Sequence, residues 1–196
     1  MSEKGRIVPA NALQAYLTRL FARTRMSQAH AAHCSTALVQ TNLWGIDSHG
    51  VLRAPLYLER LESGAVNATP QISLARGGLA LEVLDGDDGM GFVVGQAAMQ
   101  RAIELAEQYN VGAVGAVRSN HFGAAALYAH MATQRGMIGL VMTNVIPNMV
   151  APGGSRPITG NNPIAIGIPT FADFPFMLDI SLSTVAGGKL LLASKR

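Results

Sequence analysis

The sequence has little cysteine, little charge and no long apolar run, and each shortage excludes a class of protein. Its 196 residues include one cysteine, so no internal disulfide can form, as is typical of a reducing compartment. The Lys and Arg residues are dispersed, which argues against a nucleic-acid partner despite a pI of about 9.4. No apolar stretch reaches the length that crosses a bilayer, and residues 1–6 are too polar to begin a signal peptide. We therefore expect a cytoplasmic protein that binds neither nucleic acid nor membrane.

The distribution of apolar residues predicts an α/β fold that begins with helices. Hydrophobic residues make up 49% of the chain, which is enough for a well-filled core. Apolar residues at three- and four-residue steps predict a helical unit in residues 1–70, followed in residues 71–196 by a mixed sheet covered by helices. The expected helices are 13–25, 27–44, 52–63, 92–109 and 124–134. The expected strands are 72–74, 79–84, 111–117, 137–142, 164–168 and 176–180, with a turn at 85–89.

Polar side chains gather in three short stretches that connect the predicted helices and strands. The first, residues 47–53, contains a carboxylate, a hydroxyl, an imidazole and a guanidinium between two predicted helices. The second, residues 118–123, includes His121 and follows a predicted strand, where the ligands of open α/β sheets gather. The third, residues 159–163, combines a glycine with two amides that can donate to an anionic or carbonyl ligand. These stretches are the candidate parts of a site.

Several polar residues also have a simpler interpretation. His30 and His33 lie three residues apart on a predicted helix, but no third ligand has a suitable spacing, so we expect a solvated face and no metal site. The glycines of residues 86–91 lack the spacing of a dinucleotide-binding loop and flank two acids that would repel phosphate. Ser48 directly precedes His49, and adjacent side chains seldom meet in hydrogen-bond geometry, so a hydrolase is disfavoured.

Taken together, the polar motifs are similar to those of one enzyme family. In order they are Ser48-His49-Gly50 with Arg53, residues 119–123, Met142-Thr143-Asn144, Gly153-Gly154, residues 160–163 and residues 177–181. This order resembles the malate/L-lactate dehydrogenase family, which includes ureidoglycolate dehydrogenase, diketogulonate reductase and piperideine-carboxylate reductase and is unrelated to the Rossmann dehydrogenases. The resemblance implies an oxidoreductase that transfers a hydride between NAD(P)H and a small 2-oxo or 2-hydroxy acid. A cyclic imino acid or ureidoglycolate is the alternative substrate class.

The resemblance also implies a role for each polar residue. His49 is the expected general acid/base, because a pKa of about 6.5 lets an imidazole exchange a proton near neutrality. Arg53 is expected to clamp the substrate carboxylate, and Ser48 to bind the substrate or orient the imidazole. His121 is expected in the same pocket, as a second polar contact or an alternative proton carrier. The residues expected to bind NAD or NADP are Asn144, Asn161, Asn162, Pro163, Pro175, Met177, Leu178, Asp179 and Ser181.

Two features depart from the family pattern. Asn161 stands where the family usually has threonine in a G-T-N-P motif, and family members continue well beyond the position matched by Lys189. A sheet without the later elements exposes apolar surface and an unpaired edge, so we expect a fragment, a shortened gene product or an oligomer that covers the gap. Because family members are dimers, a homodimeric enzyme acting on a small carboxylate is one hypothesis. A truncated relative with little or no catalysis is the other.

Overall fold

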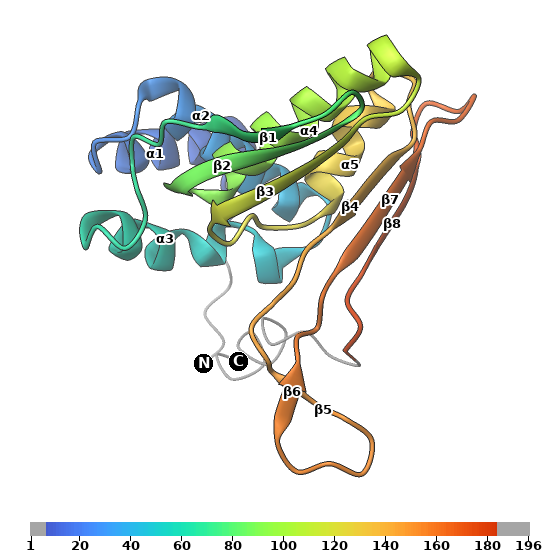
Figure 1. The fold of residues 1–196 in the computed structure, drawn as a ribbon. Coiled ribbons are helices and arrows are strands. Elements are labelled where there is room, and N and C mark those ends of the chain that lie inside the picture. The colour runs from blue at the N-terminus through green and yellow to red at the C-terminus, as the bar shows by residue number, and fades with distance from the viewer. Residues whose placement is uncertain (1–6, 184–196) are drawn as a thin grey trace.

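The structure, a computed structural model, describes residues 7–183 and confirms the predicted α/β fold class. The first three helices lie together on one side, and the strands at residues 139–142, 164–168 and 176–180 lie on the other (Figure 1). Within residues 7–183, no helix combines the length and the apolar character needed to cross a membrane.

Three helices form the first part of the chain, α1 (Ala10–Ala22), α2 (Gln28–Leu43) and α3 (Ala54–Glu62). Ser27 caps α2 as its chemistry predicts, because its hydroxyl accepts a hydrogen bond from the His30 N–H. Pro55 lies in the first turn of α3, where its missing N–H is tolerated. Between α2 and α3 the chain forms two single-turn 3₁₀ helices, η1 (Asp47–His49) and η2 (Val51–Arg53). The first polar stretch therefore has a regular local structure.

The first sheet is mixed and has the order β1-β2-β3. Its strands are β1 (Ser73–Gly77), β2 (Leu81–Gly89) and β3 (Ala113–Ser119). β1 pairs antiparallel with β2, which pairs in parallel with β3 after the crossover helix α4 (Gly91–Tyr109). The predicted turn at residues 85–89 is wrong. β2 continues to Gly89, because pairing with β3 resumes there after a bulge opposite Arg118.

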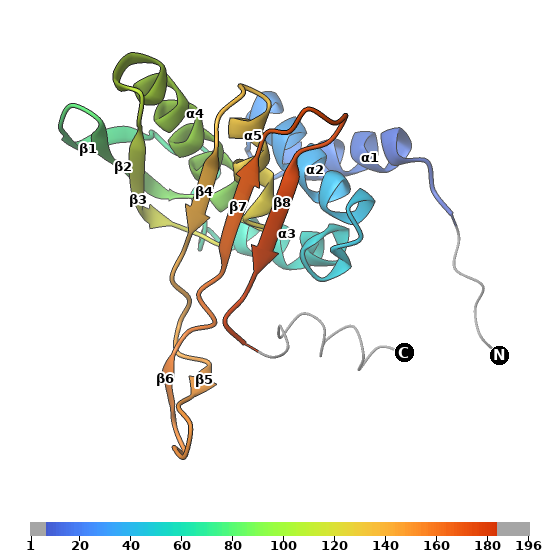
Figure 2. The ribbon, with the colours of Figure 1, turned by 90° about the vertical axis from the view of Figure 1, so that its right-hand side faces the viewer.

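The second sheet is antiparallel and has the order β4-β7-β8. Its strands are β4 (Gly139–Met142), β7 (Ile164–Ile168) and β8 (Phe176–Ile180), and α5 (Ala126–Thr133) packs against it. The loop between β4 and β7 contains a short hairpin of β5 (Met149–Val150) and β6 (Pro157–Thr159), which the sequence did not predict. Figure 2 shows this hairpin projecting away from the second sheet.

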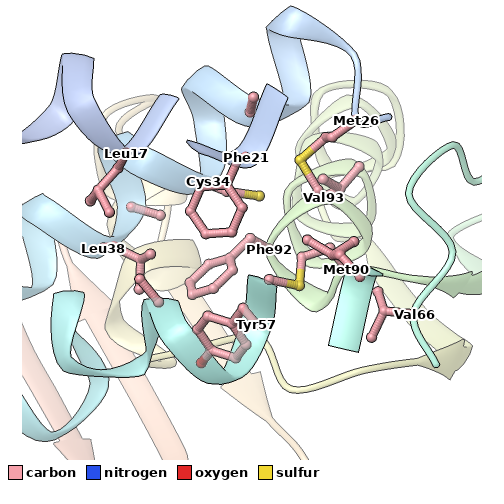
Figure 3. Packing of buried hydrophobic residues seen from close by; sticks show 14 of the residues in the cluster. Leu17, Phe21, Met26, Cys34, Leu38, Tyr57, Val66, Met90, Phe92 and Val93 are labelled. Carbon is pink, nitrogen blue, oxygen red and sulfur yellow. The ribbon is translucent and has the colours of Figure 1, made fainter. Parts of the chain in front are cut away.

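One apolar cluster joins the first three helices to α4 (Figure 3). Phe21 of α1, Leu38 of α2 and Phe92 of α4 are fully buried in it. Tyr57 of α3 lies edge-on to Phe92, with ring centroids 5.5 Å apart. Burying a Leu or Phe side chain stabilises a fold by about 1.5–3 kcal/mol, so this cluster fixes α3 against α4. The core thus extends across residue 70, and a domain boundary at that residue stays a prediction.

Candidate functional site

Asn42, near the end of α2, holds the polar stretch in place. Its Nδ2 donates to Asp47 Oδ1 of η1 at 2.5 Å, and its Oδ1 accepts from the Val51 N–H of η2 at 2.7 Å. Gly50 lies between the two contacts, where a Cβ would overlap the Asn42 amide. One side chain therefore fixes both short helices relative to α2. Asn42 was not among the expected site residues, because hydrogen bonds to residues five and nine positions ahead have no sequence signature.

Ser48, His49 and Arg53 meet within this stretch. Ser48 Oγ lies 2.9 Å from His49 Nδ1, and Arg53 Nε donates to the Ser48 carbonyl oxygen at 2.9 Å. The expectation that the adjacent Ser48 and His49 side chains do not bond is wrong, because the tight turn of η1 brings them together. Ser48 is buried, whereas His49 and Arg53 are half-buried. Ser48 therefore occupies one imidazole nitrogen of His49 and leaves Nε2 for a ligand.

His121 joins this group from a distant part of the chain. It follows β3, and its ring stacks on that of His49 with centroids 5.6 Å apart and an angle of 19° between the planes. Its Nδ1 lies 2.7 Å from the Tyr57 hydroxyl and 3.3 Å from the Gly123 nitrogen. Tyr57 was not among the expected site residues, although a tyrosine on a buried helix face needs a partner for its hydroxyl. The structure thus brings together two histidines from separate segments.

The hydrogen bonds of His121 define where its proton lies. Because the Gly123 N–H can only donate, His121 Nδ1 is an acceptor, the Tyr57 hydroxyl donates to it, and the ring proton lies on Nε2. Burial, then the charges of His49 and two arginines, lower the pKa of His121 to about 4, although the residue keeps one side exposed to solvent. Burial and then Arg53 also lower the pKa of His49. Both imidazoles are therefore neutral near pH 7, and of the two it is His49 that keeps a ring nitrogen, Nε2, for proton exchange.

Most of the residues expected to bind a cofactor lie at one end of the second sheet. Asn144 follows β4, residues 161–163 precede β7, and Ser181 follows β8. Because β7 runs antiparallel to both of its neighbours, these three segments share one end of the sheet. Pro175 precedes β8 and lies at the opposite end, so the structure does not bring it to the others. The remaining expected residues lie along β8, and they are Met177, Leu178 and Asp179.

Hydrogen bonds within this end of the sheet occupy several of the polar atoms. Asn162 Oδ1 accepts from the Val145 N–H at 3.0 Å, and Asn161 Oδ1 accepts from Asn148 Nδ2 at 3.1 Å. The oxygen ends of both amides thus hold the loop, which leaves their NH2 groups as the donors for a ligand. Asp179 instead accepts from the first N–H of α5 at 3.0 Å, and burial raises its pKa. Asp179 therefore joins β8 to α5 through one of its two oxygens.

His33 packs against α4 instead of facing solvent. Its Nε2 lies 3.1 Å from the Phe92 carbonyl oxygen, and burial lowers its pKa. The predicted solvated face is therefore wrong for His33, because α4 packs on this side of α2. Among the residues that the structure describes, 7–183, no three His, Cys, Asp or Glu side chains are grouped so as to hold a metal ion.

The chain is similar to malate and sulfolactate dehydrogenases. It is 40% identical over 196 residues to the malate dehydrogenase from Pyrococcus horikoshii, covering 97% of this chain and 54% of that protein. It is 40% identical over 158 residues to the L-sulfolactate dehydrogenase from Methanocaldococcus jannaschii, covering 81% of this chain and 46% of that protein. The crystal structure of malate dehydrogenase from Entamoeba histolytica matches with a TM-score of 0.94 at 32% identity, covering 97% of this chain and 53% of that one. The chain spans about half the length of the curated relatives it matches.

A family match extends over almost the whole sequence. Residues 8–196 match the family described as malate/L-lactate dehydrogenase. This range includes the polar stretch at 47–53, the His121 loop and the asparagines before β7, which are the motifs on which the resemblance rests. The likeness to solved relatives extends over the same elements. The chain therefore belongs to the malate/L-lactate dehydrogenase family.

Proposed function

We propose that this chain carries the substrate-binding and proton-transfer side chains of an NAD(P)-dependent dehydrogenase for small 2-hydroxy or 2-oxo acids. The observation that carries the proposal is the contact between His49 and His121, whose rings stack 5.6 Å apart near Arg53. An imidazole beside a guanidinium can exchange a proton with a hydroxyl while the cation holds a carboxylate. Relatives named for the dehydrogenation of malate and sulfolactate support a small carboxylate as the substrate class.

His49 is the proposed general acid/base. A nicotinamide cofactor, when bound, would supply the hydride acceptor for oxidation of the hydroxy acid and the hydride donor for reduction of the 2-oxo acid. In the oxidation, the substrate hydroxyl gives its proton to neutral His49, and in the reduction the imidazolium of His49 gives that proton back to the carbonyl oxygen. Ser48 holds His49 Nδ1, so the exchange takes place at Nε2. The lowered pKa of His49 favours its neutral form, which is the form that accepts a proton.

Arg53 and His121 are proposed to orient the substrate. Arg53 holds the Ser48 carbonyl oxygen through Nε, which leaves its two terminal nitrogens for a bidentate contact with the substrate carboxylate. His121 offers a fixed Nε2–H, because Tyr57 and Gly123 occupy its Nδ1. We therefore assign His121 the role of a polar contact and His49 that of the proton carrier.

NAD or NADP is proposed to bind at the end of the second sheet that contains Asn144, Asn161 and Asn162. The NH2 groups of the last two amides suit the carbonyl and phosphate oxygens of such a cofactor. Fluorescence titration of the purified chain with NADH and then with NADPH tests this proposal. We expect saturable binding of at least one of them, and saturation by neither would reject the proposed function for this chain.

The substrate class of the proposed enzyme is tested by turnover. Rates of NAD(P)H oxidation are measured with pyruvate, oxaloacetate, sulfopyruvate, a ureidoglycolate-type substrate and a cyclic imine. Turnover of any one of them supports the proposed hydride transfer and identifies its substrate class. Cofactor binding with no turnover of any of them would reject the proposed hydride transfer for this chain.

Replacing His49 by alanine tests its role directly. Loss of a general acid/base lowers turnover by about 10²- to 10⁴-fold. We expect this loss in His49→Ala, together with unchanged NAD(P)H binding in the fluorescence titration. His130→Ala is the matched control, because His130 lies on α5, where it contacts Trp44 and Thr133. Near-normal turnover in His49→Ala would show that the proton passes through another group.

We further propose that the chain forms a homodimer in the cytoplasm. Four apolar side chains of the second sheet support a subunit contact, since each is exposed over 45–65% of its surface: Leu140, Met142, Phe176 and Ile180. Sedimentation velocity over a range of micromolar concentrations measures the state of association. A monomer throughout that range would reject the dimer, and cell fractionation tests the proposed location.

A further inference from the structure

Asn120 joins two separate parts of the structure next to His121. It lies between β3 and α5, in a segment that is neither helix nor strand. Its Nδ2 donates to the carbonyl oxygens of Asp88, at 2.8 Å, and Gly89, at 3.1 Å, at the end of β2. Its Oδ1 accepts from Arg60 Nη2 of α3 at 3.0 Å. The sheet thus engages one end of this amide, and α3 engages the other.

The contact between Arg60 and Asn120 and the contact between Tyr57 and His121 join the same two segments, α3 and the loop after β3. Tyr57 and Arg60 are three residues apart on α3 and share one face, while Asn120 and His121 are neighbours in the loop. We propose that Asn120 is a positioning residue, which holds this loop between the first sheet and α3 so that His121 meets Tyr57 and His49. The inference rests on the proposed function, because that function is what makes the place of His121 matter for turnover.

The ion pairs of Arg118, close to Asn120 in the chain, do not connect the loop to α3. Arg118 pairs with Asp85 at 3.1 Å, with Asp87 at 3.1 Å and with Asp88 at 2.7 Å, which joins the end of β3 to the end of β2. The Arg118 side chain is 50% exposed, and exposed ion pairs contribute little because water screens them. None of these three pairs reaches α3. They hold the sheet together, whereas Asn120 also ties the loop to the helix that carries Tyr57.

Titration of the His121 ring by NMR tests the proposal. The groups that face this ring are the Tyr57 hydroxyl, His49, Arg53 and Arg60, and its pKa is about 4. Asn120→Ala removes no charge but frees the loop, so the ring gains water and loses the Tyr57 donor. We expect the pKa of His121 to rise by about one unit or more toward its usual value of about 6.5. Turnover should fall by about 10- to 100-fold, since a misplaced contact in a site has a cost of this order.

Two further variants separate positioning from general loss of stability. Ser35→Ala removes a buried hydroxyl that donates to Ala31 within α2, and it should leave the pKa of His121 unchanged. Arg60→Lys keeps the positive charge but loses the guanidinium that reaches Asn120, and it should raise the pKa of His121 by a smaller amount.

An unchanged pKa of His121 in folded Asn120→Ala would overturn the proposal. If Asn120→Ala does not fold, an unchanged pKa of His121 in Arg60→Lys would overturn the proposal instead. The titration needs neither substrate nor cofactor. A chain that binds no NAD(P)H but shows the expected shift would therefore reject the proposed function alone.

Discussion

Replacing Gly91 by alanine should displace the loop that carries His121. Gly91 is the first residue of α4, and a Cβ at this position would lie 2.5 Å from the carbonyl carbon and oxygen of His121. It would lie still closer to the carbonyl oxygen of Asn120. These are main-chain atoms, so they cannot rotate away as a flexible side chain can. Because non-bonded heavy atoms pack at about 3.5 Å, the loop must move by roughly 1 Å.

Two effects of opposite sign determine the change in stability. Alanine stabilises a helix by up to about 1 kcal/mol relative to glycine. Overpacking typically costs about 1–3 kcal/mol, and the displaced loop also weakens the two hydrogen bonds from Asn120 to β2, each worth about 1 kcal/mol. We therefore expect Gly91→Ala to lower the free energy of unfolding by about 2 kcal/mol.

Urea unfolding followed by circular dichroism measures this loss, and the NMR signals of His121 report the displacement of the loop. Gly64→Ala is the matched control, since a Cβ there meets nothing within 4 Å although φ is +75°. The left-handed backbone alone should cost the control about 1–2 kcal/mol and leave the His121 signals in place. A Gly91→Ala variant that is as stable as the wild type and whose His121 signals are unshifted would refute the predicted displacement of the loop.

Two smaller changes test individual hydrogen bonds. Tyr57→Phe removes the donor to neutral His121, so it should lower the free energy of unfolding by about 1 kcal/mol and raise the pKa of His121. An NMR titration of His121 identical to that of the wild type would contradict this. Burial raises the pKa of Asp179 in the folded chain, so its ionisation opposes folding, and stability falls as pH rises through the unfolded and then the folded pKa. Asp179→Asn keeps an oxygen for the first N–H of α5, so it should remove this fall and be at least as stable at pH 7 in urea unfolding. A variant that is less stable at pH 7 and keeps the same pH dependence would refute this account.

Features that depend on neighbouring residues could be predicted from the sequence. The helix that begins after Ser27 follows from a capping side chain and an apolar period, and Pro55 marks the first turn of the third helix. The family was identified by short motifs around His49, His121 and the later asparagines, and the match over residues 8–196 confirms it. In each case the information lies within a few positions along the chain.

Features that depend on distant segments could not be predicted. The apolar pattern places Tyr57 on the core side of α3. Its hydroxyl contacts His121, 64 positions further along the chain, only because the fold brings these two segments together. The Asp and Gly content of residues 85–89 is typical of a turn. Asp87 and Asp88 do adopt a left-handed backbone, but they form a bulge within β2 because pairing with β3 resumes at Gly89. β5 and β6 have two and three residues, too few for a periodic pattern to appear.

The packing of Gly50 against Asn42 limits how this part of the site can evolve. A Cβ at position 50 would meet the Asn42 amide, so a side chain there forces that amide to turn away and leaves the Val51 N–H without its acceptor. Replacing Asn42 removes the clash but loses the same acceptor. Residues in contact typically show non-additive effects of about 0.5–3 kcal/mol, so the cost of a change at one position depends on the residue at the other. Positions 42 and 50 should therefore vary as a pair among the descendants of this chain.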